Sequence, residues 1–164
     1  MRTALIPGSF DPFHNGHLDV VETASTLFDG VVVAAIRNPQ KTGQFFALDE
    51  RRDMIAESVA HLDNVNIVFF ASLVVDVARQ FGADVLVKGL RMSTDFEYEL
   101  QQAQMNKAIS GIETIFFPCA SESSFIASSL IRDIARYGGA DRLSGMVPGP
   151  VFRRLVEKFP PAEG

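Results

Sequence analysis

The sequence predicts an α/β fold, a single doubly wound five-stranded parallel sheet, from two observations. Short apolar, β-branched runs alternate along the chain with stretches of helical periodicity. The runs are almost continuously apolar, which is typical of parallel strands covered on both faces. Ligands bind beyond the carboxyl ends of the strands in such sheets. We therefore expect the functional residues directly after the predicted strands.

In the first half of the chain we expect strands at residues 4–7, 31–36 and 65–70. Between and after them, apolar residues recur at the i, i+3, i+4, i+7 spacing of helices with one buried face. Three sets of residues share such a face: Leu18, Val21, Ser25 and Phe28; Ile55, Ser58, Val59 and Leu62; and Val74, Val77, Ala78 and Phe81.

In the second half we expect strands at residues 85–87 and 114–117. A longer helix is predicted from about Thr94 to Ser110, and it includes Phe96, Leu100, Ala103 and Met105. Another begins near Ser129 and is stopped by Gly138 and Gly139, because glycine commonly ends helices. Residues 148–159 form a last short helix, and residues 160–164 a frayed tail.

Composition and charge narrow the class of protein. The 164 residues suit one domain, expected at 1–159, and 47% hydrophobic with 21% charged residues is ordinary for a soluble protein. A net charge of −5 argues against wide nucleic-acid contact. No apolar run approaches the roughly 20 residues that span a bilayer, and no export signal is evident. The single cysteine fits a reducing compartment, so we expect a cytoplasmic protein.

The most informative segment follows the first strand and reads Ser-Phe-Asp-Pro-Phe-His-Asn-Gly-His, residues 9–17. Its histidines, His14 and His17, fall on one side of a helix start. Gly16 lets a ligand approach the backbone, and the unpaired N–H groups of a helix N-terminus suit phosphate. This combination predicts a nucleotide site.

Other interpretations of the same residues are weaker. Gly8 between prolines suits ordinary turn chemistry. Two histidines do not make a zinc site, and Cys119 is a distant, single thiol that we expect in the core. Ser9, Asp11 and His17 lie too close in sequence for a catalytic triad. The sequence also lacks a nucleophile elbow, a dinucleotide-binding glycine motif and a Walker A string.

Basic residues follow two other strands. Lys41 lies past the second strand, where a surface charge is the plain alternative to a phosphate contact. Lys88 and Arg91 flank Gly89 and Leu90 after the fourth strand, a pattern that suits a polyphosphate clamp but also a routine basic loop. Acidic residues that follow, including Glu97 and Glu99, also suit the dipole at a helix start.

A serine-rich segment follows the fifth strand and leads into a helix. Serine caps helices well, and a cluster at a helix start also offers hydroxyl and N–H groups to phosphate or adenine. The serine-rich segment consists of Ser123, Ser124, Phe125, Ile126, Ala127, Ser128 and Ser129.

His61, elsewhere in the chain, has the pattern of a surface residue.

Residues 9–17 resemble the signature of the HxGH/TxGH nucleotidyltransferase superfamily, which implies a Rossmann-like fold. Three further motifs narrow the resemblance to the phosphopantetheine adenylyltransferase family. They are Lys-Gly-Leu-Arg at 88–91, Asp-Phe-Glu-Tyr-Glu at 95–99 and Ser-Phe-Ile at 124–126. This implies transfer of the adenylyl group of ATP to 4′-phosphopantetheine with Mg²⁺, by a cytoplasmic homohexamer.

The resemblance also implies roles for individual residues. Ser9 would bind phosphates of both substrates, His17 would stabilise the transition state, and the phosphopantetheine site would include Lys41, Val74 and Lys88. The ATP site would include Phe10, His17, Gly89, Leu90, Arg91, Glu99 and the whole serine-rich segment from Ser123 to Ser129.

Three departures from the family pattern concern local detail. His14 stands where the family often has threonine, and Ala127 replaces a usual serine. The loop at 42–46 is one residue longer than in relatives. Two other functions fit part of the pattern: another nucleotidyltransferase of the superfamily with a different acceptor, or a nucleotide-binding regulator without catalysis.

Overall fold

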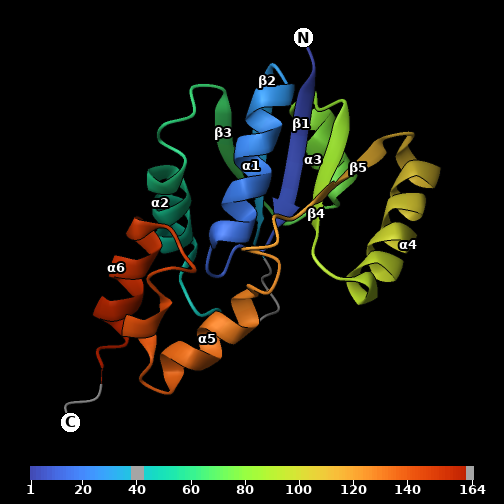
Figure 1. Cartoon of the computed structure of the whole chain (residues 1–164). Helices are drawn as coiled ribbons and strands as arrows, with labels where there is room; N and C mark the ends of the chain where they lie inside the picture. Colours follow the sequence, from blue (N-terminus) through green and yellow to red (C-terminus); the bar gives the residue numbers. More distant parts are fainter. Residues whose placement is uncertain (38–42, 162–164) are drawn as a thin grey trace.

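A computed structural model describes residues 1–37 and 43–161 and contains a parallel five-stranded sheet in the order β3-β2-β1-β4-β5 (Figure 1). All five predicted strands are present, and the doubly wound α/β prediction is confirmed. The strands are β1 Thr3–Gly8, β2 Gly30–Ile36, β3 Val65–Phe70, β4 Val85–Leu90 and β5 Glu113–Pro118.

Strand β4 continues three residues beyond its predicted end. Lys88, Gly89 and Leu90 pair in register with Phe116, Phe117 and Pro118 of β5. Lys88 and Gly89 interrupt the apolar run, so the end of the strand is concealed in the sequence.

The helices lie close to their predicted positions. Helix α2 ends at Ser58, although Leu62 continues its apolar face in the sequence; Leu62 instead closes a turn by donating its N–H to the Val59 carbonyl at 2.9 Å. A short 3₁₀ helix, η1, was not expected. The helices are α1 Asn15–Leu27, α2 Leu48–Ser58, α3 Val74–Gln80, α4 Ser93–Ser110, α5 Ser128–Arg136, η1 Ala140–Leu143 and α6 Gly149–Lys158.

Side chains of β1 alternate between two cores, one on each face of the sheet. Ala4 and Ile6 enter the larger core with α1, α2, α5 and α6, whereas Leu5 enters the smaller core with Val77 and Ala78 of α3. Burial on both faces explains the continuous apolarity of the strand sequences. None of the described helices is long and apolar enough to cross a bilayer.

Helix α4 lies at the right-hand edge of the molecule in Figure 1, beyond β5. Its residues from Asp95 to Ser110 are all partly or fully exposed. Phe96 makes an edge contact with Phe116 of β5 at a ring distance of 5.9 Å, but Met105 and Ile109 are 61% and 54% exposed. An apolar surface therefore remains uncovered along this helix.

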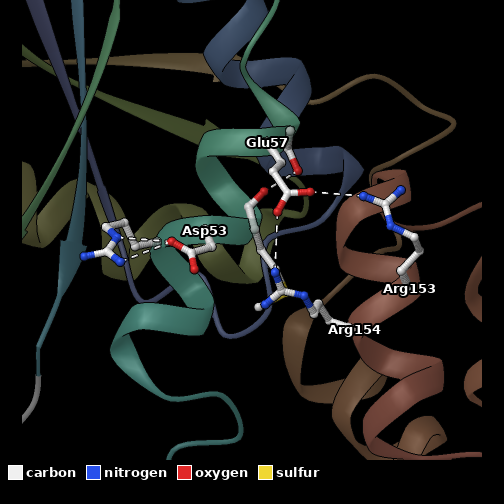
Figure 2. Close-up of polar contacts among 7 residues, drawn as sticks. Asp53, Glu57, Arg153 and Arg154 are labelled. Carbon is white, nitrogen blue, oxygen red and sulfur yellow. Dashed lines mark hydrogen bonds and ion pairs between the residues drawn. The ribbon is translucent and has the colours of Figure 1, made fainter.

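Helix α6 is tied to α2 by ion pairs that Figure 2 shows. The Glu57 carboxylate accepts from Arg153 at 3.0 Å and lies 3.4 Å from Arg154. One turn earlier on α2, Asp53 pairs with Arg52 at 3.2 Å. These groups are at least one-third exposed, so water screens each pair strongly.

Candidate functional site

A cavity of about 760 Å³ lies beyond the carboxyl ends of β1 and β4, where the strand order reverses. In Figure 1 this is the lower edge of the sheet, above α5 and beside the start of α1. The structure brings most of the predicted site residues to its wall. They are Ser9, Phe10, His17, Lys88, Gly89, Arg91, Glu99, Ala127, Ser128 and Ser129.

The turn after β1 shapes one side of the cavity. Phe10 has a φ of 48°, and its buried ring lies against the backbone of Gly8. A Cβ atom at Gly8 would come within 2.8 Å of that ring. Gly8 is therefore required by a close approach, and Ser9 is left exposed at the cavity.

The two histidines cap helix α1 and fix each other. The Gly16 N–H donates to His14 Nδ1 at 3.1 Å, and the His14 N–H donates to His17 Nδ1 at 3.2 Å. Because each Nδ1 accepts, the proton of each neutral ring lies on Nε2. The rings stack with centroids 3.6 Å apart.

His17 is held in a largely apolar setting. Its ring centroid lies 4.9 Å from that of Phe10, in an edge-on arrangement, and 5.5 Å from that of Phe13, which stacks on it. Burial, then His14 and Arg91, lower the pKa of His17 well below 6.5, and burial and Arg91 lower the pKa of His14 to about 4. At neutral pH, His17 therefore offers an Nε2–H donor without a positive charge.

The opposite wall comes from β4 and α4. Lys88 Nζ lies 2.9 Å from the Glu99 carboxylate, and both side chains are mostly buried. Arg91 donates to the Ile126 carbonyl at 2.8 Å and lies 3.4 Å from Asp95. Glu99 is thus paired with Lys88, whether or not its place near the start of α4 also suits the helix dipole.

Only the last three residues of the serine-rich segment reach the wall. Ser123 is buried and its hydroxyl donates to the Asp19 carboxylate, Ser124 donates to the Ser121 carbonyl, and Phe125 is 60% exposed. Ile126 belongs to the core. Ala127 is the N-cap of α5 and makes no side-chain bond there, so the serines do not cap this helix.

Two further predicted residues lie elsewhere, and a third falls outside the described residues. Val74 begins α3 and packs against the smaller core on the other face of the sheet. Leu90 ends β4 but does not line the cavity. Lys41 lies outside the described residues.

Several residues that were not predicted line the cavity. Arg132 and Arg136 follow Ser128 at four-residue intervals on α5, so helical spacing was a usable signal. Arg132 donates to the Asp11 carbonyl at 2.8 Å. The Cys119 thiol, expected in the core, is partly buried at the wall, and burial raises its pKa.

The cavity combines a neutral hydrogen-bond donor with cations on two sides, which suits a polyanion. Within 1–37 and 43–161, no group of three or more His, Cys, Asp or Glu side chains is arranged to hold a metal ion. A divalent cation here would be held mainly by ligand phosphates and water, which is usual for Mg²⁺.

Comparisons with known proteins agree with this architecture. The chain is 17% identical to a putative nicotinate-nucleotide adenylyltransferase of Vibrio parahaemolyticus, with a TM-score of 0.67 over 95% of this chain and 99% of that one. A bifunctional NMN adenylyltransferase/ADP-ribose pyrophosphatase of Francisella tularensis gives a TM-score of 0.63 at 17% identity, over 84% of this chain and 42% of that one. The same bifunctional protein has also been crystallised with AMP and a manganese ion. At this identity the solved structures show the shared fold alone.

Sequence comparison gives the narrower relationship. Residues 5–134 match the cytidylyltransferase-like family. A phosphopantetheine adenylyltransferase of Synechococcus sp. is 49% identical over 158 residues, which cover 96% of this chain and 98% of that protein. The chain therefore belongs to the phosphopantetheine adenylyltransferase family, within the cytidylyltransferase-like nucleotidyltransferases.

Proposed function

We propose that this protein transfers the adenylyl group of ATP to 4′-phosphopantetheine, giving dephospho-coenzyme A and pyrophosphate, a step of coenzyme A synthesis. The main observation behind this proposal is that His17, whose lowered pKa leaves it neutral, lines a cavity of about 760 Å³. The 49% identity to a phosphopantetheine adenylyltransferase supports the choice of acceptor.

The reaction is an in-line displacement at phosphorus. A phosphate oxygen of phosphopantetheine attacks the α-phosphorus of ATP, and the bond from that phosphorus to the bridging oxygen of the β-phosphate breaks. Pyrophosphate takes the electron pair and leaves. Positioning and charge stabilisation supply most of the rate in such transfers, so the enzyme needs no nucleophile and forms no covalent intermediate.

His17 has the geometry of a transition-state donor. Its Nδ1 is occupied by the His14 N–H, so Nε2–H is the group available to an α-phosphate oxygen. Because the ring is fixed by stacking and by the helix start, little reorganisation accompanies the reaction.

We assign two substrate regions to the cavity and its surroundings; Val74, Leu90 and residues 123–126 do not line the cavity itself. Ser9 and Lys41 align the attacking phosphate, and Lys88 and Val74 complete the phosphopantetheine region. The ATP region contains Phe10, through its backbone, Gly89, Leu90, Arg91, Glu99 and the segment 123–129. These assignments are best supported for the residues that line the cavity. Arg132 also lines it and would add a cation near the leaving pyrophosphate.

Magnesium is the proposed metal; substrate phosphates and water would hold most of its coordination positions, and it would offset the negative charge of the phosphates. We propose that residues 1–159 act as one catalytic domain in the cytoplasm and assemble as a homohexamer. The exposed apolar residues of α4 support self-association, since such surfaces commonly form interfaces.

The test is pyrophosphate release from Mg-ATP by the purified protein with three acceptors: 4′-phosphopantetheine, nicotinamide mononucleotide and glycerol 3-phosphate. We expect release only with phosphopantetheine, and dephospho-coenzyme A as the product. Release with another acceptor would overturn the substrate assignment. A folded protein that binds ATP but releases none would be a nucleotide-binding regulator.

A further inference from the structure

Arg51 is the largest fully buried side chain in the described part of the chain, at 1% exposure. It extends from α2 into the molecule and reaches the cavity wall. In the sequence it stands three and four residues before Met54 and Ile55, on the buried face of the helix. An apolar side chain would suit this position for packing alone, because a buried charge costs stability.

The Arg51 guanidinium joins three segments that surround the site. Its Nη1 donates to the Ser9 carbonyl at 2.7 Å and to the Ile36 carbonyl at 3.1 Å. Its Nη2 donates to Gln44 Oε1 at 3.2 Å. One side chain thus connects the turn after β1, the end of β2 and the segment that leads into α2.

Asp11 makes the reciprocal connection. Its two carboxylate oxygens accept from the N–H groups of Phe45 and Phe46, each at 2.8 Å. Burial lowers the pKa of the Arg51 guanidinium, and the negative charge of Asp11 partly offsets this effect. The turn at residues 9–11 is therefore tied to the segment at 44–46 by its backbone and by its side chain.

These bonds determine how the turn faces a ligand. A trans peptide group carries its C=O and N–H on opposite sides, so the bond from Arg51 to the Ser9 carbonyl orients the N–H of Phe10. Phe10 has a positive φ, which an unsupported phenylalanine rarely adopts. In the described ranges, the Phe10 N–H donates to no protein acceptor.

We infer that Arg51 is a positioning residue for adenylyl transfer, which, paired with Asp11, holds the Ser9–Phe10 peptide so that its N–H meets substrate phosphate. The inference rests on the proposed function. Arg51 acts through the turn, and its buried guanidinium is already bonded to protein acceptors.

The experiment compares Arg51→Met, Arg51→Lys and a matched control, Arg52→Met, in steady-state pyrophosphate release. Arg52 is the next residue on α2, but its side chain is 53% exposed and pairs with the surface acids Asp49 and Asp53. We expect Arg51→Met to lower kcat about 100-fold, as misplaced catalytic geometry does, with a much smaller change in either KM. Arg51→Lys should recover part of kcat, because it keeps a cationic donor without the planar fork.

A double-mutant cycle separates positioning from packing. Asp11→Asn should also lower kcat, and Asp11→Asn/Arg51→Met should lose little more than Arg51→Met alone, because both residues act on one turn. Rates are referred to the folded fraction, measured by circular dichroism under assay conditions. If Arg51→Met fails to fold, Arg51→Lys and Asp11→Asn carry the test.

The inference is overturned if the folded Arg51 variants match the control in kcat, or if the losses multiply in the double variant. Failure of the proposed function is a separate result. In that case the wild type itself would release no pyrophosphate with phosphopantetheine, and the same variants would be compared with whichever acceptor is used.

Discussion

His17 meets the cavity as an uncharged donor because its Nδ1 accepts the His14 N–H and desolvation of the partly buried ring lowers its pKa. Replacing it with alanine removes the proposed donor to the α-phosphate, so we expect His17→Ala to lower kcat about 100-fold or more. Pyrophosphate release measures this effect. His61→Ala is the matched control, since His61 is exposed and pairs with Glu22 on the surface. Near-normal turnover of a folded His17→Ala protein would contradict the proposed role.

The same pair of histidines makes stability depend on pH. Unfolded histidine binds a proton near pH 6.5, but His14 in the fold does so only at about pH 4. Between these values the unfolded chain holds more protons, so the free energy of unfolding falls as the pH falls. The shift of His14 corresponds to about 3 kcal/mol, lost between pH 6.5 and pH 4.

Urea unfolding at pH 7.5, 6.0 and 5.0 measures this dependence. The control is His14→Thr, which offers a hydroxyl oxygen in place of Nδ1 as the acceptor of the helix cap but does not titrate in this range. We expect the variant to lose less stability on acidification than the wild type. Equal slopes would show that His14 is not the titrating group.

At the scale of secondary-structure elements, β4 and α1 meet at Gly89. A Cβ atom there would lie 2.8 Å from Val20 Cγ2 and 3.1 Å from the Cys119 sulfur. Gly89→Ala should therefore lower the free energy of unfolding by about 1–3 kcal/mol through overpacking. Val20→Ala removes the closest atom. Adding Gly89→Ala should therefore cost less stability in the Val20→Ala background than in the wild type. Chemical denaturation of the four proteins tests this coupling, and strict additivity would contradict it.

The contact between α2 and α6 looks well bonded in Figure 2 but involves exposed charges. Glu57→Gln removes both ion pairs with Arg153 and Arg154. We expect a loss of less than about 1 kcal/mol, and less again at 1 M salt, because exposed pairs are screened. Thermal or urea unfolding at two salt concentrations measures it. A large, salt-independent loss would show that Glu57 supports the fold in another way.

The elements were predictable where burial imposes a pattern. Strands β1 to β3 are apolar because both faces are covered, and α3 repeats the helical spacing clearly. The end of β4 was missed because Lys88 faces the cavity. Sequence position also could not separate Ser128, at the wall, from Ser123, which bonds Asp19. Such distinctions depend on contacts between segments that lie far apart in the sequence.

Arg51 marks a different limit of sequence reasoning. Its position on the apolar face of α2 was readable, but its partners, Ser9 and Ile36, come from two other segments. The clustering of basic residues after strand ends did predict Lys88 and Arg91 at the wall. Arg132 could have been predicted at the wall only by extending the serine-rich segment along the helix that follows it.

At the scale of the whole molecule, α4 carries the largest consequence. Met105 and Ile109 are more than half exposed on a helix with little cover from the sheet. If α4 mediates assembly, Met105→Glu/Ile109→Lys should convert the proposed hexamer into smaller species by placing charge in an apolar contact. Light scattering coupled to size-exclusion chromatography measures the mass. Leu27→Glu, an exposed apolar position at the end of α1, is the control. A monomeric wild type would contradict the proposed assembly.

The strand order also has a consequence for synthesis on the ribosome. The first strand made, β1, is central, and its second neighbour, β4, lies about half a chain later, since Ala4 pairs with Val85. The cavity further needs Arg132 and Arg136 of α5. A nascent chain therefore makes the turn at residues 9–11 early, but it completes the cavity only after most of the protein has left the exit tunnel.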